Sequence, residues 1–273
     1  MPPESFDAAW LTRREPVDHR SRAVELMPPL REAWRAREWS RVLDLGCGTG
    51  SNLRYLCARL PGPQHWTLVD NDPALLASAN QTTRSADVHG ITCVRGDLAH
   101  EGIEAIRHAH LVTGAALLDL VSDAWLERMV DACERAGTGA LFTLTYDGGI
   151  TWSPAEEDDE LVRTTVNAHQ RRDKGVGPAL GPSAGARAER LFRDRGYRTW
   201  AQASPWVLGP RDDRLTGALV EGWERVALEW DEAEDATRRI RDWARRRQRT
   251  IASGAFRLLV GHVDVLALPA ERA

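Results

Sequence analysis

The first half of the chain alternates short apolar runs with stretches whose apolar residues recur at helical spacing. Val42–Leu45 is an apolar run that contains one acid, and residues 51–60 after it have the pattern of an amphipathic helix. Later runs predict strands at 65–70, 91–95, 110–116 and 139–146, with helices between them. Strands that alternate with helices predict a parallel α/β sheet.

The pattern in the second half of the chain predicts two more strands and a larger proportion of helical residues. Residues 184–195 have a helical pattern, 197–203 the pattern of a strand, and 256–268 form a long apolar strand near the end. We also expect helices over 5–39, before the first strand, and over 213–249, before the last one. The pattern therefore predicts seven strands, with additional helices outside the alternating core.

A glycine turn follows the first predicted strand. Gly46, Gly48 and Gly50 precede the helix, and glycine lets the backbone approach a ligand where a Cβ would clash. The spacing is not the G-x-G-x-x-G of dinucleotide-binding folds, and no Gly-Lys-Ser/Thr follows, which excludes a phosphate-binding P-loop. Asp70 ends the second strand about 20 residues later, where an ionised acid can accept hydrogen bonds from both hydroxyls of a ribose. These features predict a nucleotide-type site at the carboxyl end of the sheet.

Composition narrows the classes of function. The 273 residues carry a net charge of −4, so no overall field attracts nucleic acid or an acidic membrane. The chain has no apolar run of about 18 residues, and its N-terminus lacks the basic and apolar segments of a signal peptide. The four cysteines form no Cys-x-x-Cys, and no cluster of histidines and carboxylates suggests a metal. We therefore expect a cytoplasmic protein without a metal site.

The run Val42-Leu-Asp-Leu-Gly-Cys-Gly-Thr-Gly50 resembles motif I of the class I S-adenosylmethionine-dependent methyltransferases. The resemblance implies one methyltransferase domain over 1–273, with a Rossmann-like seven-stranded α/β sheet whose last strand is antiparallel. It also implies helices on both faces of the sheet and helical cap insertions. The expected parts are an N-terminal helical cap (1–40), a cofactor-binding core (41–147), a lid insertion (148–186) and a C-terminal part of the sheet (187–273) with a helical insertion (213–249).

The resemblance implies S-adenosylmethionine as the cofactor. In the family the acid before the first glycine, here Asp44, meets the methionine end, and the glycine turn packs against the methionine and ribose. Gly96-Asp97-Leu98 resembles the family's Gly-Asp-Leu motif, in which the acid meets the adenine amino group and the next backbone amide meets a ring nitrogen. The predicted cofactor site comprises Asp44, Gly46, Cys47, Gly48, Gly50, Asp70, Asn71, Asp97, Leu98 and Thr113.

Residues after the fourth and fifth strands are candidates to hold the methyl acceptor. Leu117-Leu-Asp-Leu-Val-Ser-Asp123 resembles the family's motif IV region, often Leu-His-His-Leu-Pro-Asp, with Asp119 in place of the first histidine. Tyr146 and Asp147 end the fifth strand, where open α/β sheets place their ligands, and His169 lies in the predicted lid helix. If a base is needed, we predict His169 or Asp147. We predict that Tyr146 and Asp119 orient the acceptor. The alternatives are a structural cap for Asp119 and a solvated lid helix for His169.

Cationic side chains leave several alternatives open. In this family the helices before the first strand often cover the cofactor, so its carboxylate could be reached by Arg13, Arg14, His19 or Arg22. A solvated basic face is the alternative for these four residues. Lys174, the only lysine, is a candidate for a place that needs a compact ammonium. The arginine-rich run 238–249 is either an RNA-binding arm or a solvated helical face, and the acidic residues before it favour the second.

The expected activity is methyl transfer from S-adenosylmethionine to an oxygen, nitrogen or carbon atom of a small molecule, with secondary metabolism as one open setting. An RNA or protein methyltransferase is the alternative enzyme. A non-catalytic S-adenosylmethionine-binding or scaffold protein is the alternative of another class. The expected partner is a small-molecule methyl acceptor, with no membrane and no nucleic acid, and both a monomer and a homodimer remain open.

Overall fold

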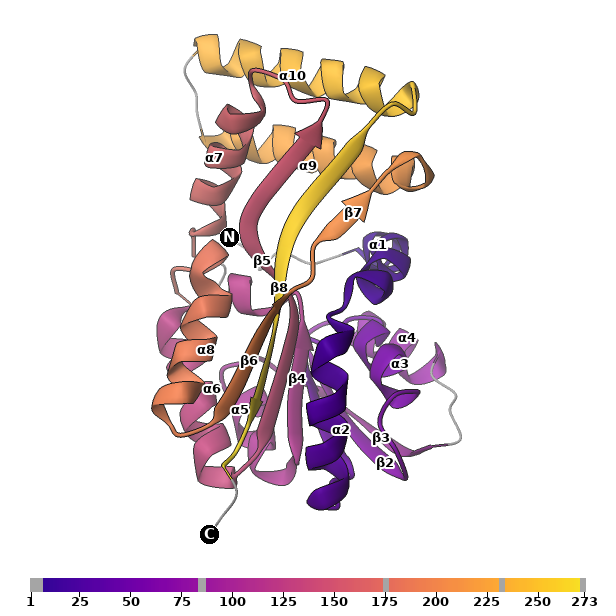
Figure 1. The fold of residues 1–273 in the computed structure, drawn as a ribbon, viewed down its shortest axis with the longest axis vertical. Coiled ribbons are helices and arrows are strands. Elements are labelled where there is room, and N and C mark those ends of the chain that lie inside the picture. Colours follow the sequence, from indigo (N-terminus) through magenta and orange to yellow (C-terminus); the bar gives the residue numbers. More distant parts are fainter. Residues whose placement is uncertain (1–6, 83–86, 174–176, 231–233, 271–273) are drawn as a thin grey trace.

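A computed structural model describes residues 7–82, 87–173, 177–230 and 234–270, so Lys174 lies outside the described part of the chain. Within these ranges the chain forms one mixed sheet of eight strands, in the order β3-β2-β1-β4-β5-β8-β6, with β7 paired to β8 (Figure 1). The strands β1 to β5 are parallel, and β8 runs antiparallel to both β5 and β6. The strands are β1 (Arg41–Leu45), β2 (Gln64–Asp70), β3 (Val88–Arg95), β4 (Leu111–Ala115), β5 (Gly139–Ser153), β6 (Arg198–Ala203), β7 (Trp206–Leu208) and β8 (Arg257–Leu268).

Helices cover both faces of this sheet, as the alternating pattern predicted. The helices α2, α3 and α4 pack on one face, and α6 and α8 pack on the other. The helices are α1 (Ala8–Ser21), α2 (Met27–Ala36), α3 (Ser51–Cys57), α4 (Pro73–Thr82), α5 (Glu101–Ala105), α6 (Asp123–Ala136), α7 (Asp159–Gln170), α8 (Ala184–Asp194), α9 (Asp213–Trp230) and α10 (Glu234–Ala252). Short 3-10 turns lie at Val24–Leu26, Ile106–His108, Leu118–Leu120, Gly181–Ser183 and Pro210–Asp212.

Alternate residues of the central strands supply the two cores. Successive side chains of a strand point to opposite faces, so a buried strand that is apolar throughout feeds both sides. Leu43 and Val112 pack with α6 and α8. Val42 and Leu111 pack with α2 and α3. This double burial explains why the first and fourth strands have almost continuous apolar runs.

The fifth strand is longer than the sequence predicted. We expected it to end at Tyr146, because Asp147-Gly-Gly149 has the composition of a turn. In the structure the three residues lie in a register shift of the ladder, and β5 continues to Ser153 beside β8. Ile150 and Trp152 explain the continuation, since both are buried against helices beyond the core. The short strand β7 also pairs with β8 here, which gives eight strands where seven were expected.

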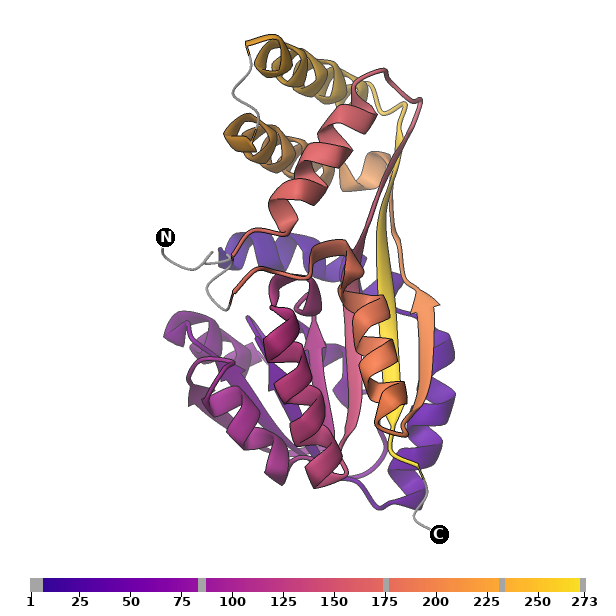
Figure 2. The same ribbon diagram turned by 90° about the vertical axis from the view of Figure 1, so that its left-hand side faces the viewer.

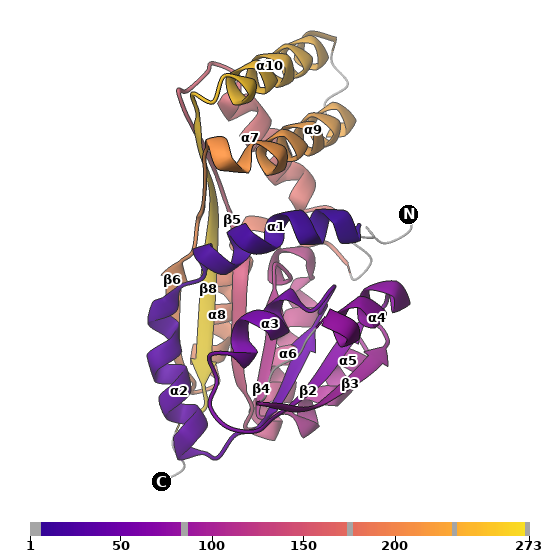
Figure 3. The same ribbon diagram turned by 90° about the vertical axis from the view of Figure 1, so that its right-hand side faces the viewer.

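The extended ends of β5 and β8, with β7, carry a helical module made of α7, α9 and α10. Figure 2 shows this module grouped at one end of the molecule, beyond the core sheet. Its interior is a separate apolar cluster that includes Val162, Leu215 and Trp243. In Figures 1 and 3, α1 lies between α9 of the module and α3 of the core. None of the helices in the described ranges is both long enough and apolar enough to cross a bilayer.

The arginine-rich run on α10 is used inside the module. Arg246 binds Glu156 (Nε–Oε2 2.6 Å) and Asp158 (Nη2–Oδ2 2.8 Å) at the start of α7. Arg247 is fully buried, where Nε and Nη2 donate to Asp159 and Nη1 donates to the Pro154 carbonyl at 2.9 Å. The acidic residues 156–160 therefore have a second role besides beginning a helix. They form ion pairs with arginines of α10, about 90 residues later in the chain. Both the solvated face and the RNA-binding arm are wrong for the buried Arg247, while Arg246 remains partly exposed.

The buried pair predicts a large effect of one substitution on folding. Asp159→Ala leaves the Arg247 guanidinium buried without its main partner, and we expect it to lower the free energy of unfolding by about 3–5 kcal/mol. Urea denaturation at neutral pH measures the change. Asp235→Ala is the matched control, because the Asp235–Arg238 pair is 67% and 71% exposed and such pairs contribute about 1 kcal/mol or less. Equal effects of the two substitutions would contradict the structural role of the buried pair.

Candidate cofactor and acceptor site

The glycine turn between β1 and α3 adopts a backbone that only glycine accepts without strain. Gly46, Gly48 and Gly50 have φ of 61°, 52° and 83°. The amide of Gly46 donates to the carbonyl of Val69 in β2 at 2.9 Å, which holds the turn against the neighbouring strand. A Cβ added at Gly48 would lie 3.1 Å from Leu11 Cδ1, so α1 lies directly over the turn. Side chains at these positions would strain the turn and displace α1.

Asp70 connects the second strand to the glycine turn. It is 8% exposed, and its Oδ2 accepts from the Gly48 amide at 2.8 Å. Its Oδ1 accepts from the amide of Asp72 at 3.0 Å. Each carboxylate oxygen can accept a second hydrogen bond, so this acid retains acceptor capacity beside the turn. Cys47 is buried within the same turn, and Asn71 is exposed next to Asp70.

Asp44 is completely buried, and only one of its two carboxylate oxygens has a hydrogen-bond partner in the described part of the chain. Its Oδ1 accepts from Asn52 Nδ2 at 2.8 Å, while Oδ2 has no hydrogen-bond partner within the described residues. Burial raises the pKa of Asp44 to about 7, although the Asn52 hydrogen bond and the charge of Arg22 lower it. Thr113 lies behind this pair, where its Oγ1 accepts from Asn52 Nδ2 at 3.0 Å and donates to the Leu141 carbonyl at 2.7 Å.

Arg22, just after α1, reaches the same place. It is 5% exposed, and its Nη1 donates to Asn52 Oδ1 at 3.0 Å and to the Thr143 hydroxyl. Its Nε and Nη2 have no hydrogen-bond partner in the described ranges. The guanidinium carbon lies 4.9 Å from the ring centroid of Tyr55, a cation–π contact that holds the guanidinium in place.

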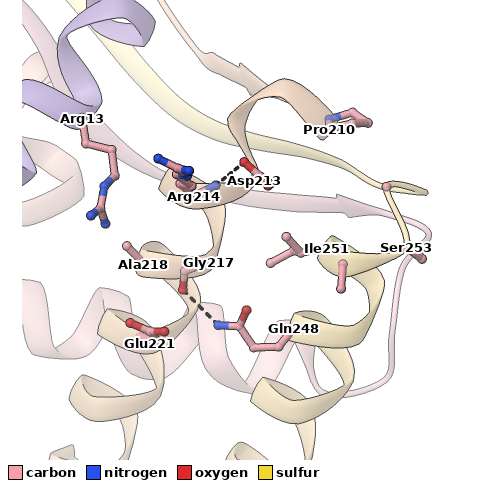
Figure 4. A pocket seen from close by; sticks show the side chains of 12 residues that line it. Arg13, Pro210, Asp213, Arg214, Gly217, Ala218, Glu221, Gln248, Ile251 and Ser253 are labelled. Carbon is pink, nitrogen blue, oxygen red and sulfur yellow. Dashed lines mark hydrogen bonds between the residues drawn. The ribbon is translucent and has the colours of Figure 1, made fainter.

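The three other cationic candidates near the N-terminus have different surroundings. Arg14 binds Asp18 (Nε–Oδ2 2.9 Å), and His19 Nε2 lies 3.1 Å from the Ser51 carbonyl and hydroxyl oxygens. Arg13 lines a groove of about 680 Å³ between α1, the start of α9 and the end of α10 (Figure 4). The other charged residues of that groove are Asp213, Arg214 and Glu221, and it contains none of the predicted cofactor or acceptor residues.

The buried polar atoms fit the amino-acid end of S-adenosylmethionine. A buried polar atom without a partner is costly, so such atoms in a folded protein need an explanation. The free oxygen of Asp44 is complementary to an ammonium group, and the free nitrogens of Arg22 are complementary to a carboxylate. The glycine turn beside them allows close approach of a ligand. The residues present could therefore hold this cofactor.

Asp97 and Leu98 lie away from this buried group. Asp97 is exposed, and both its oxygens contact His100 Nδ1, at 3.1 and 3.0 Å. Hydrogen bonding to His100 lowers the pKa of Asp97. The carbonyl of Leu98 accepts from Trp125 Nε1 at 2.9 Å. The adenine contacts expected of Asp97 and Leu98 remain a prediction.

Two of the four acceptor candidates lie near each other, Asp119 after the end of β4 and Tyr146 within β5. The Tyr146 hydroxyl donates to Asn167 Oδ1 on α7 at 2.8 Å. Burial raises the pKa of Tyr146, and the nearby charges of Asp147 and Asp119 raise it further. This phenol is therefore protonated at neutral pH and acts as a hydrogen-bond donor. Asp119 is itself buried, after the end of β4.

The other two acceptor candidates face different surroundings. The Asp147 side chain is exposed, accepts from the Gly149 amide at 2.9 Å and packs over the backbone of Gly261. His169 lies against α9, where its Nε2 is 3.8 Å from Glu229 Oε2. Residues two apart on a helix point to nearly opposite sides, so His169 faces away from the side of α7 that meets Tyr146. His169 is therefore turned away from Tyr146, whereas the exposed Asp147 lies close enough for its charge to raise the pKa of Tyr146.

Sequence reasoning missed a buried histidine beside Tyr146. His262 Nδ1 donates to the Val260 carbonyl at 3.0 Å, and its ring centroid lies 6.1 Å from Tyr146 and 5.0 Å from Trp206. Burial lowers the pKa of His262 to about 3, with a smaller effect from the charge of Arg14, so the ring is neutral. The signal was present in the sequence: His262 is a polar residue in the middle of a long apolar strand.

Part of the chain resembles a known protein family. Residues 42–137 match a family model described as a methyltransferase domain. No curated protein matches the chain. Among solved structures, phosphoethanolamine N-methyltransferase 2 of Haemonchus contortus is 16% identical with a TM-score of 0.42, and the match covers 85% of this chain and 49% of that one. A methyltransferase of Geobacter sulfurreducens is 15% identical with a TM-score of 0.42, and 92% of each chain is covered.

This chain thus spans about half the length of the Haemonchus enzyme. Neither similarity assigns a substrate. The matched segment covers β1 to α6, and it includes the glycine turn, Asp70 and the buried Asp44. Residues 42–137 of this chain are therefore similar to a methyltransferase domain.

Proposed function

We propose that this protein transfers a methyl group from S-adenosylmethionine to a small-molecule acceptor. The proposal rests on two buried charged residues beside the glycine turn, Asp44 on β1 and Arg22 just after α1. Each has side-chain atoms without a hydrogen-bond partner in the described part of the chain. When bound, the cofactor supplies an electrophilic methyl group on a sulfonium. Asp44 binds its ammonium group, and Asp70 accepts hydrogen bonds from its ribose. The turn from Gly46 to Gly50 lets the backbone pack closely against both parts.

The protein's own contribution is alignment of the acceptor in a place from which water is excluded. The Tyr146 phenol donates a hydrogen bond, and the neutral His262 ring can accept one through Nε2. Asp119 lies close to Tyr146 and provides a charged acceptor group. Because His262 has a depressed pKa, it is a weak base and acts better as an orienting group. Where the acceptor must lose a proton, Asp119 is the better placed group.

The arrangement of the helices around the site favours a small-molecule acceptor. The helix α1 lies between the core and the helical module, and Leu11 on α1 lies over the glycine turn. An RNA substrate would need an open basic surface, whereas two central arginines of the α10 run, Arg246 and Arg247, are paired with acids of the module. The net charge of −4 also disfavours a polyanion. A protein or RNA acceptor is therefore the weaker candidate.

A transfer assay tests the proposed activity. We expect purified protein, given methyl-labelled S-adenosylmethionine and a panel of small hydroxyl, amine and activated-carbon compounds, to label a low-molecular-weight product. Asp70→Ala should reduce the rate at least tenfold, because it removes a charged acceptor from the ribose. Binding of S-adenosylhomocysteine without transfer to any class of acceptor would favour the non-catalytic alternative. Label found only in added RNA or protein would favour the other enzyme class.

The pKa of Asp44 predicts how cofactor affinity depends on pH. In the unliganded protein Asp44 is half protonated near pH 7, and a bound ammonium needs the carboxylate. The affinity for S-adenosylhomocysteine should therefore fall by about tenfold for each pH unit below 7 and level off above it. The charge of Arg22 lowers the pKa of Asp44 and the charge of Asp70 raises it, but burial is the largest cause of the shift.

Calorimetric titrations between pH 5 and 7 measure this dependence, in a range where the ligand's ammonium stays protonated. Asp44→Asn should bind weakly and show a flat profile. His100→Gln is the control, since His100 is an exposed titratable group whose pKa is raised by its hydrogen bond to Asp97. It should keep the wild-type slope. A wild-type affinity that is independent of pH would show that Asp44 does not meet the ammonium group.

A further inference from the structure

The strand β5 contains a β-bulge a few residues before Tyr146. Two residues of β5, Thr143 and Leu144, lie opposite one residue of β8, Asp264, because the register with β8 shifts by one residue between Phe142 and Thr145. A β-bulge places an extra residue in one strand, and such bulges often redirect side chains next to functional sites.

We infer that Asp264 is a positioning residue for the acceptor side of the site, because it holds the bulge that turns Tyr146 onto the cofactor side of the sheet. The effect passes through the backbone of β5, since Asp264 accepts from the amide of Leu144. This inference rests on the proposed function, in which Tyr146 helps to align the acceptor.

The side chains around the bulge show the change of side. Alternate residues of a regular strand share a side, so Tyr146 would lie on the side of Phe142, which packs with α6 and α8. Thr145 takes that side instead, since a Cβ added at Gly185 of α8 would lie 3.9 Å from its Cγ2. Tyr146 therefore faces the opposite side, where it pairs with His262 and the two ring centroids are 6.1 Å apart.

The contacts of β8 identify this opposite side as the side of the cofactor site. Asp264 lies two residues after His262 on the same strand, so the two side chains point to the same side of the sheet. Asp264 Oδ2 accepts from the amide of Ala23 at 3.0 Å. Ala23 directly follows Arg22, whose guanidinium is part of the buried group around Asn52.

The backbone of Leu144 needs a partner that holds it in place. Its φ is 54°, a conformation that a bulky residue rarely adopts, and Leu144 is fully buried. Its amide donates to Asp264 Oδ1 at 2.7 Å, and the same oxygen accepts from the Ser204 hydroxyl at 2.6 Å. Asp264 is only 1% exposed, so this carboxylate stabilises a backbone conformation that leucine alone does not favour.

Fluorine NMR tests the inference, because the chain has only three tyrosines, Tyr55, Tyr146 and Tyr197. The full chain is labelled with 3-fluorotyrosine, and Tyr146→Phe assigns the Tyr146 signal. Tyr197 packs in the core on the α6 and α8 side, so its signal reports the fold on the side away from the cofactor. We expect S-adenosylhomocysteine to shift the wild-type Tyr146 signal by more than its line width and to leave the Tyr197 signal in place.

Two variants disturb the bulge in different ways. Asp264→Ala removes the acceptor of the Leu144 amide. Leu144→Ile keeps the size of the side chain but adds a β-branch, which opposes a positive φ. In each variant we expect the Tyr146 signal of the free protein to move and its shift on binding S-adenosylhomocysteine to be lost, while the Tyr197 signal stays. A merely structural role would disturb both signals together.

Leu141→Ile is the matched control, because Leu141 is a buried leucine in the regular part of the same strand. It should keep the wild-type Tyr146 signal and its shift. If Asp264→Ala does not fold, Leu144→Ile decides the result. A wild-type Tyr146 signal that ignores bound S-adenosylhomocysteine, or variants that keep the wild-type signals, would overturn the inference and leave the proposed function standing. If calorimetry shows that folded wild-type protein does not bind this ligand, the proposed function fails, and the role of Asp264 fails with it.

Discussion

Buried polar groups on the α1 side of the sheet constrain the rest of this structure. Asp44, Thr113, Thr143 and Asp264 contribute these groups from β1, β4, β5 and β8. Such groups must find partners inside the protein, because water does not reach them. The segment that follows α1 supplies two of these partners, the Arg22 guanidinium and the amide of the next residue, Ala23. The N-terminal segment is therefore held to the sheet by hydrogen bonds to its buried face, and the cofactor site forms between them.

The helix α1 connects the two halves of the site. One side of it meets the core, where Glu15 binds Arg54 (Oε2–Nη2 2.5 Å) and Leu11 lies over Gly48. The other side meets the helical module and β7, through buried Val17 and through Arg14, which lies 5.1 Å from the Trp206 ring centroid. A shift of α1 would therefore change the cover of the cofactor and the surroundings of His262 together.

Local pattern was enough to predict the core, and long-range pairing accounts for what was missed. The strand at Val42–Leu45 and the glycine turn follow from burial on both faces and from backbone conformations that need glycine. The extension of β5 beyond Tyr146 could not be seen, because Asp147-Gly-Gly149 has turn composition and the ladder continues only through its pairing with β8. The partners of the α10 arginines lie about 90 residues earlier in the chain. His169 shows the same limit, since only the packing of α7 on α9 decides which way it faces.

Two buried arginines in this chain show how a structural charge differs from a functional one. In the helical module, Arg247 uses Nε, Nη1 and Nη2 for partners within the chain, so its guanidinium is complete without a ligand. In the core, Arg22 uses Nη1 alone and keeps the edge that suits a carboxylate. Both residues sit in a dry environment where an unpaired charge is costly. If stability were the only requirement, we would expect Nε and Nη2 of Arg22 to have hydrogen-bond partners within the chain, as they do in Arg247. The open edge of Arg22 is therefore best explained by a ligand that binds there. The buried oxygen of Asp44 left open at the same site is consistent with this explanation, because a ligand with both an ammonium and a carboxylate group would complete both residues.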